Sequence, residues 1–231
     1  MAIERSVALE RFSWFDQLAL RCIGRPVSHL TPRYLLDRYR LWVHQRRSPN
    51  APWLTAEAIA ILNTALRKAD NGLEYGSGRS TIWLSHRTNR LISIEHSPVW
   101  YRWVCETIER EELKDVVCKY IPANEEPPDD PYRASYVEGD AGIAPGSLDY
   151  VLIDGLYRGE CALRAVDLLK PGGLLILDNA NRYIPHDTRS PHAAATPLNP
   201  LWSELLSRVA DWRLIWTSNG VFDTALWFKA S

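Results

Sequence analysis

Cysteine and net charge are both scarce in this chain of 231 residues. The cysteines number four and lie far apart, with no C-x-x-C pair, which excludes a zinc ribbon and a thioredoxin-type redox motif. We therefore expect buried free thiols and a reducing compartment. The formal net charge is only −1 at pH 7, which argues against a broad nucleic-acid-binding surface.

Long apolar runs are lacking as well, since no stretch approaches the length that a membrane-spanning helix needs. The first dozen residues carry Glu4, Arg5, Glu10 and Arg11, so they do not form the apolar core of a secretory signal. The sequence therefore predicts a cytoplasmic protein. Hydrophobic and charged contents of 46% and 24% are ordinary for a globular protein, and the length suits one α/β domain with a modest extension.

The chain is organised around a short apolar strand, a glycine turn and a helix start between Gly72 and Leu84. Gly76 and Gly78 permit a tight turn and a close approach of the backbone to a ligand. The helix that follows presents unpaired N–H groups and the positive end of its dipole to whatever lies on the turn. This pattern predicts a cradle for an anionic or carboxylate-bearing small molecule.

Acidic residues follow the later apolar runs of the chain. Glu95 ends one run, Asp140 follows Val137-Glu138-Gly139, and Asp154 and Asp178 end two further runs. Ligands of an open parallel sheet bind in the crevice at the carboxyl ends of its strands. We therefore expect these carboxylates to share one pocket with the glycine turn.

The order of these motifs resembles that of the class I S-adenosylmethionine-dependent methyltransferases over roughly residues 54–231. The motifs are E-x-G-x-G from Glu74, the acid Glu95, G-D-A from Gly139, D-Y-V-L-I-D-G from Asp149 and L-K-P-G-G-L-L-I-L-D-N from Leu169. The resemblance implies a Rossmann-like, mostly parallel α/β sheet of seven strands with helices on both faces. Residues 212–228 read as the terminal antiparallel hairpin of that sheet.

The resemblance also implies a set of cofactor contacts. Glu74, Gly76 and Gly78 would line the methionine end, Glu95 would hold the ribose hydroxyls, and Asp140 with Ala141 would meet the adenine. Ser80 replaces the third glycine of the family's motif, and its hydroxyl can still bind a carboxylate. The full predicted set is Glu74, Gly76, Ser77, Gly78, Ser80, Thr81, Glu95, His96, Asp140, Ala141 and Asp154.

Two catalytic routes fit the remaining residues. By position, Asp154, Asp178 and Asn179 match the metal ligands of the catechol and caffeoyl-coenzyme A O-methyltransferases. Such oxygen ligands suit Mg²⁺ or Ca²⁺, and the metal would lower the pKa of two vicinal substrate hydroxyls. The catechol enzymes place a lysine base three residues after the first aspartate, whereas this chain has Tyr157 there.

The second route is a metal-free general base. His186 and His192 lie in the long segment 181–200, and loops of this length are often lids over a site. A histidine side chain accepts a proton near neutral pH. The candidate catalytic residues are therefore Asp154, His186 and Tyr157, and Arg158, Arg182 and Tyr183 border the same mouth. The alternative is that the histidines are exposed loop residues without a role.

The sequence divides into a helical, basic extension over residues 1–50 and a domain over residues 51–231. The extension is a solvated cap, a contact for an anionic substrate or a homodimer contact. Trp53, in the connector, either packs in the core or forms part of the pocket wall. Thr55 is predicted to cap a helix from Ala56 to about Lys68.

The leading hypothesis is a methyltransferase that uses S-adenosylmethionine on a small-molecule acceptor, most consistent with transfer to oxygen. One alternative is a non-catalytic binding or scaffold protein that keeps the pocket. A weaker alternative is a dinucleotide-dependent oxidoreductase, because the spacing from Gly76 to Glu95 also suits a ribose-binding acid in that fold. The terminal hairpin and the missing third glycine count against it.

Overall fold

The computed structural model describes residues 30–124, 129–139 and 142–230. In this part of the chain seven strands form one sheet with the spatial order β3-β2-β1-β4-β5-β7-β6. The strands are β1 (Asn71–Tyr75), β2 (Arg90–Glu95), β3 (Val116–Tyr120), β4 (Leu148–Ile153), β5 (Leu169–Asp178), β6 (Arg213–Ser218) and β7 (Asp223–Phe228). The first five pair in parallel, and β7 runs antiparallel to both of its neighbours.

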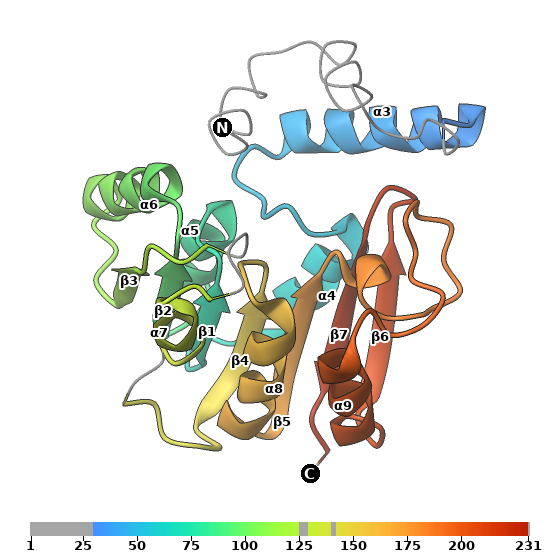
Figure 1. Cartoon of the computed structure of the whole chain (residues 1–231). Helices are drawn as coiled ribbons and strands as arrows, with labels where there is room; N and C mark the ends of the chain where they lie inside the picture. Colours follow the sequence, from blue (N-terminus) through green and yellow to red (C-terminus); the bar gives the residue numbers. More distant parts are fainter. Residues whose placement is uncertain (1–29, 125–128, 140–141, 231) are drawn as a thin grey trace.

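Helices cover both faces of the sheet (Figure 1). One face packs against α4 (Ala56–Ala65) and α5 (Arg79–Ser85), with α6 (Pro98–Arg110) beside α5. The other face packs against α7 (Arg133–Val137), α8 (Arg158–Leu168) and α9 (Pro200–Arg208). The predicted architecture, a mostly parallel sheet with a terminal antiparallel hairpin, is confirmed.

Strand β4 shows why the central strands are almost continuously apolar. Successive side chains of a strand point to opposite faces, so Tyr150 and Leu152 pack against α4 and α5, whereas Val151 and Ile153 pack toward α8. All four side chains are buried because helices cover both faces. The acid that follows, Asp154, is therefore the first residue of this segment that reaches the open end of the sheet.

The helix before β1 begins as predicted and ends earlier. Thr55 caps α4, because its hydroxyl accepts a hydrogen bond from the N–H of Ala58 at 3.3 Å. The same hydroxyl lies 2.5 Å from that of Thr217 on β6, which ties the helix start to the hairpin. Helix α4 ends at Ala65 rather than near Lys68, since Leu66 already has an extended backbone.

The segment before Asp140 differs from the prediction. Val137-Glu138-Gly139 was expected to end a strand, whereas Arg133–Val137 forms the short helix α7. Strand β3 already pairs with β2 at that edge, and the ring of Tyr136 is instead buried in the core on the α8 side of the sheet. Asp140 and Ala141 lie outside the described residues.

Helix α3 (Pro32–Arg47) is the described part of the N-terminal extension. It lies beyond the carboxyl ends of the parallel strands (Figure 1). It begins at a Thr31 cap and meets the β6–β7 turn where the carboxylate of Asp37 lies against Gly220. The helical segment predicted before Pro26 lies outside the described residues. Within the described ranges no helix is both long and apolar enough to cross a membrane.

Gly76 and Gly172 allow a matched test of the turn after β1. Both have positive φ values, +95° and +75°, but a Cβ on Gly76 would lie 2.6 Å from the nitrogen of Gly155, whereas a Cβ on Gly172 would meet nothing within 4 Å. We expect Gly172→Ala to lower the free energy of unfolding by about 1 kcal/mol and Gly76→Ala by about 3 kcal/mol or more. Urea unfolding measures both, and equal losses would contradict the close packing of the turn.

Candidate functional site

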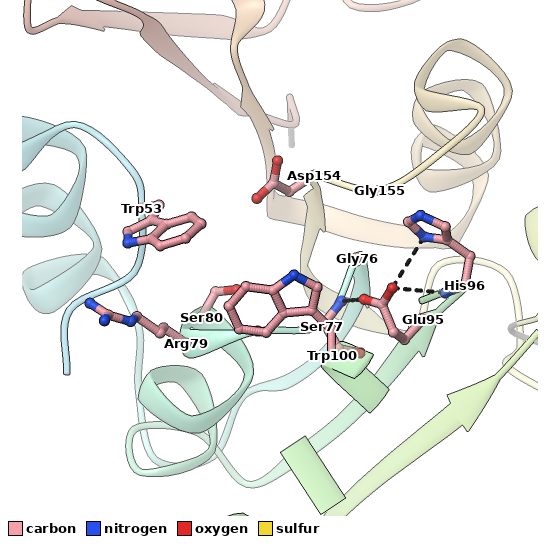
Figure 2. A pocket seen from close by; sticks show the side chains of 11 residues that line it. Trp53, Gly76, Ser77, Arg79, Ser80, Glu95, His96, Trp100, Asp154 and Gly155 are labelled. Atoms are coloured by element: carbon pink, nitrogen blue, oxygen red, sulfur yellow. Dashed lines mark hydrogen bonds and ion pairs between the residues drawn. The ribbon is translucent and has the colours of Figure 1, made fainter. Parts of the chain in front are cut away.

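A cavity of about 200 Å³ lies at the carboxyl ends of β1, β2 and β4. Figure 2 shows its side chains converging from the connector before α4, the glycine turn, the start of α6 and the end of β4. It is lined by Trp53, Gly76, Ser77, Gly78, Arg79, Ser80, Glu95, His96, Trp100, Asp154 and Gly155. Seven of the predicted cofactor residues are thus brought together, because the carboxyl ends of parallel strands lie at the same edge of the sheet.

The glycine turn is held in place by its neighbours. The N–H of Gly76 donates to the carbonyl of Ile94 at 2.8 Å, and Gly76 packs directly on the backbone of Gly155. Two residues later, the N–H of Gly78 donates to the hydroxyl of Thr81 at 2.9 Å. These contacts fix the turn against β2 and against the loop after β4, so the floor of the cavity is preformed.

Glu74 lies beneath this turn and does not line the cavity. Its side chain is fully buried, and one carboxyl oxygen accepts hydrogen bonds from the hydroxyls of Thr81 at 2.5 Å and Ser93 at 2.6 Å. Burial raises the pKa of Glu74 to about 7, although the hydroxyls of Ser80, Ser93 and Thr81 oppose the shift. The carboxyl predicted to line the methionine end therefore braces the turn from below.

Glu95 connects the two backbone segments that flank the cavity. One of its carboxylate oxygens accepts the N–H of Ser77 at 2.6 Å. The other accepts the N–H groups of His96 and Ser97 at 2.9 and 2.6 Å and lies 3.1 Å from the Nδ1 atom of His96 (Figure 2). A carboxylate has about four acceptor positions, so the three backbone donors leave about one for a ligand.

Two tryptophans and an arginine form another part of the cavity wall. The rings of Trp53 and Trp100 meet edge to face, with centroids 5.8 Å apart, and the guanidinium of Arg79 lies 5.5 Å from the Trp53 ring centre. Trp53 thus lies in the pocket wall, one of its two predicted roles. Sequence reasoning missed Arg79, Trp100 and Gly155. The position of Trp100 could have indicated its role, since it lies in the first turn of the helix that follows the strand ending at Glu95.

Asp154 lines the cavity at the end of β4, and Arg158 holds it. The guanidinium of Arg158 donates to the Asp154 carboxylate at 2.7 Å and to the Asp154 carbonyl at 2.8 Å. It also donates to the carbonyls of Asp178 at 2.7 Å and Gly155 at 3.0 Å. Burial raises the pKa of Asp154, with the Arg158 charge opposing; burial and the Asp154 charge raise the pKa of Asp178 well above its ordinary value.

No protein-family model and no curated protein matches the chain. Among solved structures, a methyltransferase-like protein from Silicibacter pomeroyi aligns with 78% of this chain and 89% of its own at 17% identity and a TM-score of 0.55. A candidate O-methyltransferase from Klebsiella pneumoniae aligns with 96% of this chain and 99% of its own at 15% identity and a TM-score of 0.53. TehB from Haemophilus influenzae aligns with 80% of this chain and 66% of its own at 16% identity and a TM-score of 0.53.

The chain has the class I methyltransferase fold. At these sequence identities the likeness concerns the fold alone, so the function has to be argued from the site. Within the methyltransferase fold, the cavity lies at the carboxyl ends of β1, β2 and β4, where an open α/β sheet binds ligands.

The predicted metal ligands do not fit a divalent cation. Hard cations such as Mg²⁺ need several free oxygen ligands. Here the carboxylate of Asp154 is paired with Arg158, and the amide of Asn179 donates an N–H to the carboxylate of Asp178. In the described part of the chain, no three His, Cys, Asp or Glu side chains are grouped so that they could hold a metal ion.

The other two predicted catalytic side chains lie away from the cavity. The hydroxyl of Tyr157 donates to the Asp130 carboxylate at 2.6 Å and lies 2.8 Å from the Asn124 carbonyl, with the ring buried. The exposed ring of His186 stacks on Trp216 of β6 at 4.1 Å. Neither lines the cavity, because Tyr157 is bound to the segment that contains Asn124 and Asp130, and His186 lies on the hairpin. His192 is likewise exposed, in the same loop.

The raised pKa of Glu74 predicts a pH-dependent stability. The folded state keeps the proton up to about pH 7, whereas the unfolded chain releases it near 4.5, so this contribution falls as the pH rises between those values. Between pH 5 and pH 8 the wild type should lose about 2–3 kcal/mol of stability relative to Glu74→Gln. Urea unfolding at both pH values measures this difference.

Glu106→Gln, on the exposed face of α6, is the control for that comparison, and it should follow the wild type at both pH values. If the wild type and Glu74→Gln lost the same stability between pH 5 and pH 8, Glu74 would have an ordinary pKa in the folded state.

Proposed function

We propose that this chain is an S-adenosylmethionine-dependent methyltransferase that acts on a small-molecule acceptor, with transfer to oxygen. The observation that carries the proposal is the cavity in which the glycine turn, Glu95 and Asp154 meet. The solved structures of the same fold are support of a coarser kind, since two of the three discussed above are named as a methyltransferase or a methyltransferase-like protein.

The lining side chains suit the separate parts of this cofactor. The guanidinium of Arg79, at the start of α5, offers donors to the methionine carboxylate. The remaining acceptor position of Glu95 suits one ribose hydroxyl, with His96 beside it. Trp53 and Trp100 line the cavity, and an aromatic ring attracts a positively charged sulfonium.

The acceptor chemistry falls to Asp154. Methyl transfer from a sulfonium needs in-line attack, so the protein has to align the acceptor and remove its proton. Asp154 is a carboxylate that lines the cavity, and its pKa is raised by burial, which makes it a stronger proton acceptor than an exposed aspartate. A hydroxyl acceptor hydrogen-bonded to Asp154 would lose its proton to that carboxylate as the oxygen attacks the methyl group.

Titration with S-adenosylmethionine and S-adenosylhomocysteine tests the cofactor site. We expect both to bind the wild-type protein, and Glu95→Ala to weaken binding by about 10- to 100-fold, because a hydrogen bond to a charged group contributes about 1.5–3 kcal/mol. Isothermal titration calorimetry measures the affinities. Glu106→Ala removes an exposed carboxylate from α6 and should bind like the wild type.

The outcomes separate the alternatives. If neither compound binds at millimolar concentration, the methyltransferase proposal fails. If both bind but no methyl group reaches any of a panel of phenols, carboxylates and amines, with or without Mg²⁺, the chain is a binding protein. The buried position of Tyr157, where the catechol enzymes have their lysine base, is the observation that favours this second candidate.

A further inference from the structure

We propose that Arg158 is a built-in cation that takes the place of a divalent metal between the ends of β4 and β5, so that the site works without a metal ion. This inference deepens the proposed function and rests on it only for the acceptor chemistry, because its main test needs neither cofactor nor acceptor. Arg158 acts as a positioning residue for Asp154.

The backbone directs Arg158 into this position. Tyr157 has a left-handed conformation, with φ of +46°, and α8 begins at the next residue. Because the chain turns at Tyr157, the side chain of Arg158 points back toward the carboxyl ends of β4 and β5. The side chain of Arg158 is only 14% exposed, so the guanidinium is held inside the protein and not at its surface.

The guanidinium binds one carboxylate oxygen of Asp154, a predicted metal ligand, together with three backbone carbonyl oxygens beside it. Four of its five N–H donors are used by the contacts given above, to the Asp154 carboxylate and to the carbonyls of Asp154, Asp178 and Gly155. Arginine keeps its charge in proteins, so this positive charge is permanent. A divalent cation beside Asp154 would face it across a few ångströms of partly buried protein, where charges interact strongly.

The neighbouring side chains bind the carboxylate of Asp178 and so turn it away from the cavity. The Asn179 amide donates to the Asp178 carboxylate, and the Thr224 hydroxyl lies 3.5 Å from the other oxygen of that carboxylate. Asp178 is 4% exposed and does not line the cavity, whereas Asp154 does. The cluster therefore presents one carboxylate to the cavity, with Arg158 behind it.

This arrangement has a consequence for the acceptor. A metal site selects acceptors with two vicinal oxygens, because both can coordinate the ion. A single carboxylate held by an arginine needs only one hydroxyl. The acceptor class that follows is a small molecule with an isolated hydroxyl, for which a catechol arrangement brings no advantage.

The test is the binding of Mn²⁺ alone to the full-length chain, by calorimetry and by the electron paramagnetic resonance signal of free Mn²⁺. The wild type should bind no Mn²⁺ at millimolar concentration. Arg158→Ala and the neutral, bulkier Arg158→Gln remove the fixed charge and should bind Mn²⁺ with a dissociation constant at least about tenfold below the highest concentration at which the wild type shows no binding. Arg158→Lys keeps a positive charge and should behave like the wild type.

Arg208→Ala is the matched control, since Arg208 pairs with Asp167 in an ion pair between α9 and α8 that is far more exposed. It should gain no Mn²⁺ binding. Removal of Asp178 from the Arg158→Ala background, as Asp178→Asn, should abolish the gain and so place the new site.

Two results would overturn the proposal. One is Mn²⁺ binding to the wild type that Asp178→Asn removes, because the arginine would then give way to a metal. The other is an Arg158→Ala protein that is folded by circular dichroism and yet binds no more Mn²⁺ than Arg208→Ala. If neither neutral variant folds, the wild-type titration decides. A failure of S-adenosylmethionine binding would refute the proposed function and leave these results unchanged.

Discussion

The bonds between the Glu95 carboxylate and three backbone N–H groups are the constraint on which the cavity depends. They join the glycine turn at Ser77 to the first residues after β2, at His96 and Ser97. Each bond has a charged acceptor and is shielded from water, since Glu95 is 2% exposed, so together they resist separation of the two segments. The same carboxylate keeps about one acceptor position for a ligand, so one side chain both holds the two segments together and can bind a ligand.

The two other buried carboxyl groups near the cavity, Glu74 and Asp154, are stabilised in different ways. Glu74 lies under the turn with its pKa raised to about 7, among hydroxyl groups and without a cationic partner. Asp154 has such a partner in Arg158, and its pKa is raised less than it would be alone, because that positive charge favours the ionised form. The cofactor side of the cavity therefore has a scaffold of hydrogen bonds, whereas the acceptor side has a carboxylate held by a fixed cation.

Most of the fold and the floor of the site were predictable from the sequence. The apolar runs at β1, β2, β4 and β5 each end in an acid or a glycine turn, and a parallel sheet brings such ends together. The predictions for Tyr157 and His186 were wrong because tertiary contacts set the positions of these side chains. Tyr157 occupies the position of a catalytic lysine, yet its hydroxyl is drawn to Asp130, 27 residues away in the sequence. His186 has the chemistry of a base but stacks on Trp216 of the hairpin. The contacts of Arg158 were only partly predictable for the same reason, because the Asp178 carbonyl that it binds lies at the end of another strand.

The central claim is that the cavity over Gly76, bounded by Glu95 and Asp154, binds a sulfonium nucleoside. The most direct measurement is a crystal structure of the protein with saturating S-adenosylhomocysteine. We predict that the amino-acid part of the ligand lies over the glycine turn, a ribose hydroxyl binds Glu95 and the sulfur faces Asp154. Ligand density elsewhere on the molecule, with this cavity occupied only by solvent, would contradict it.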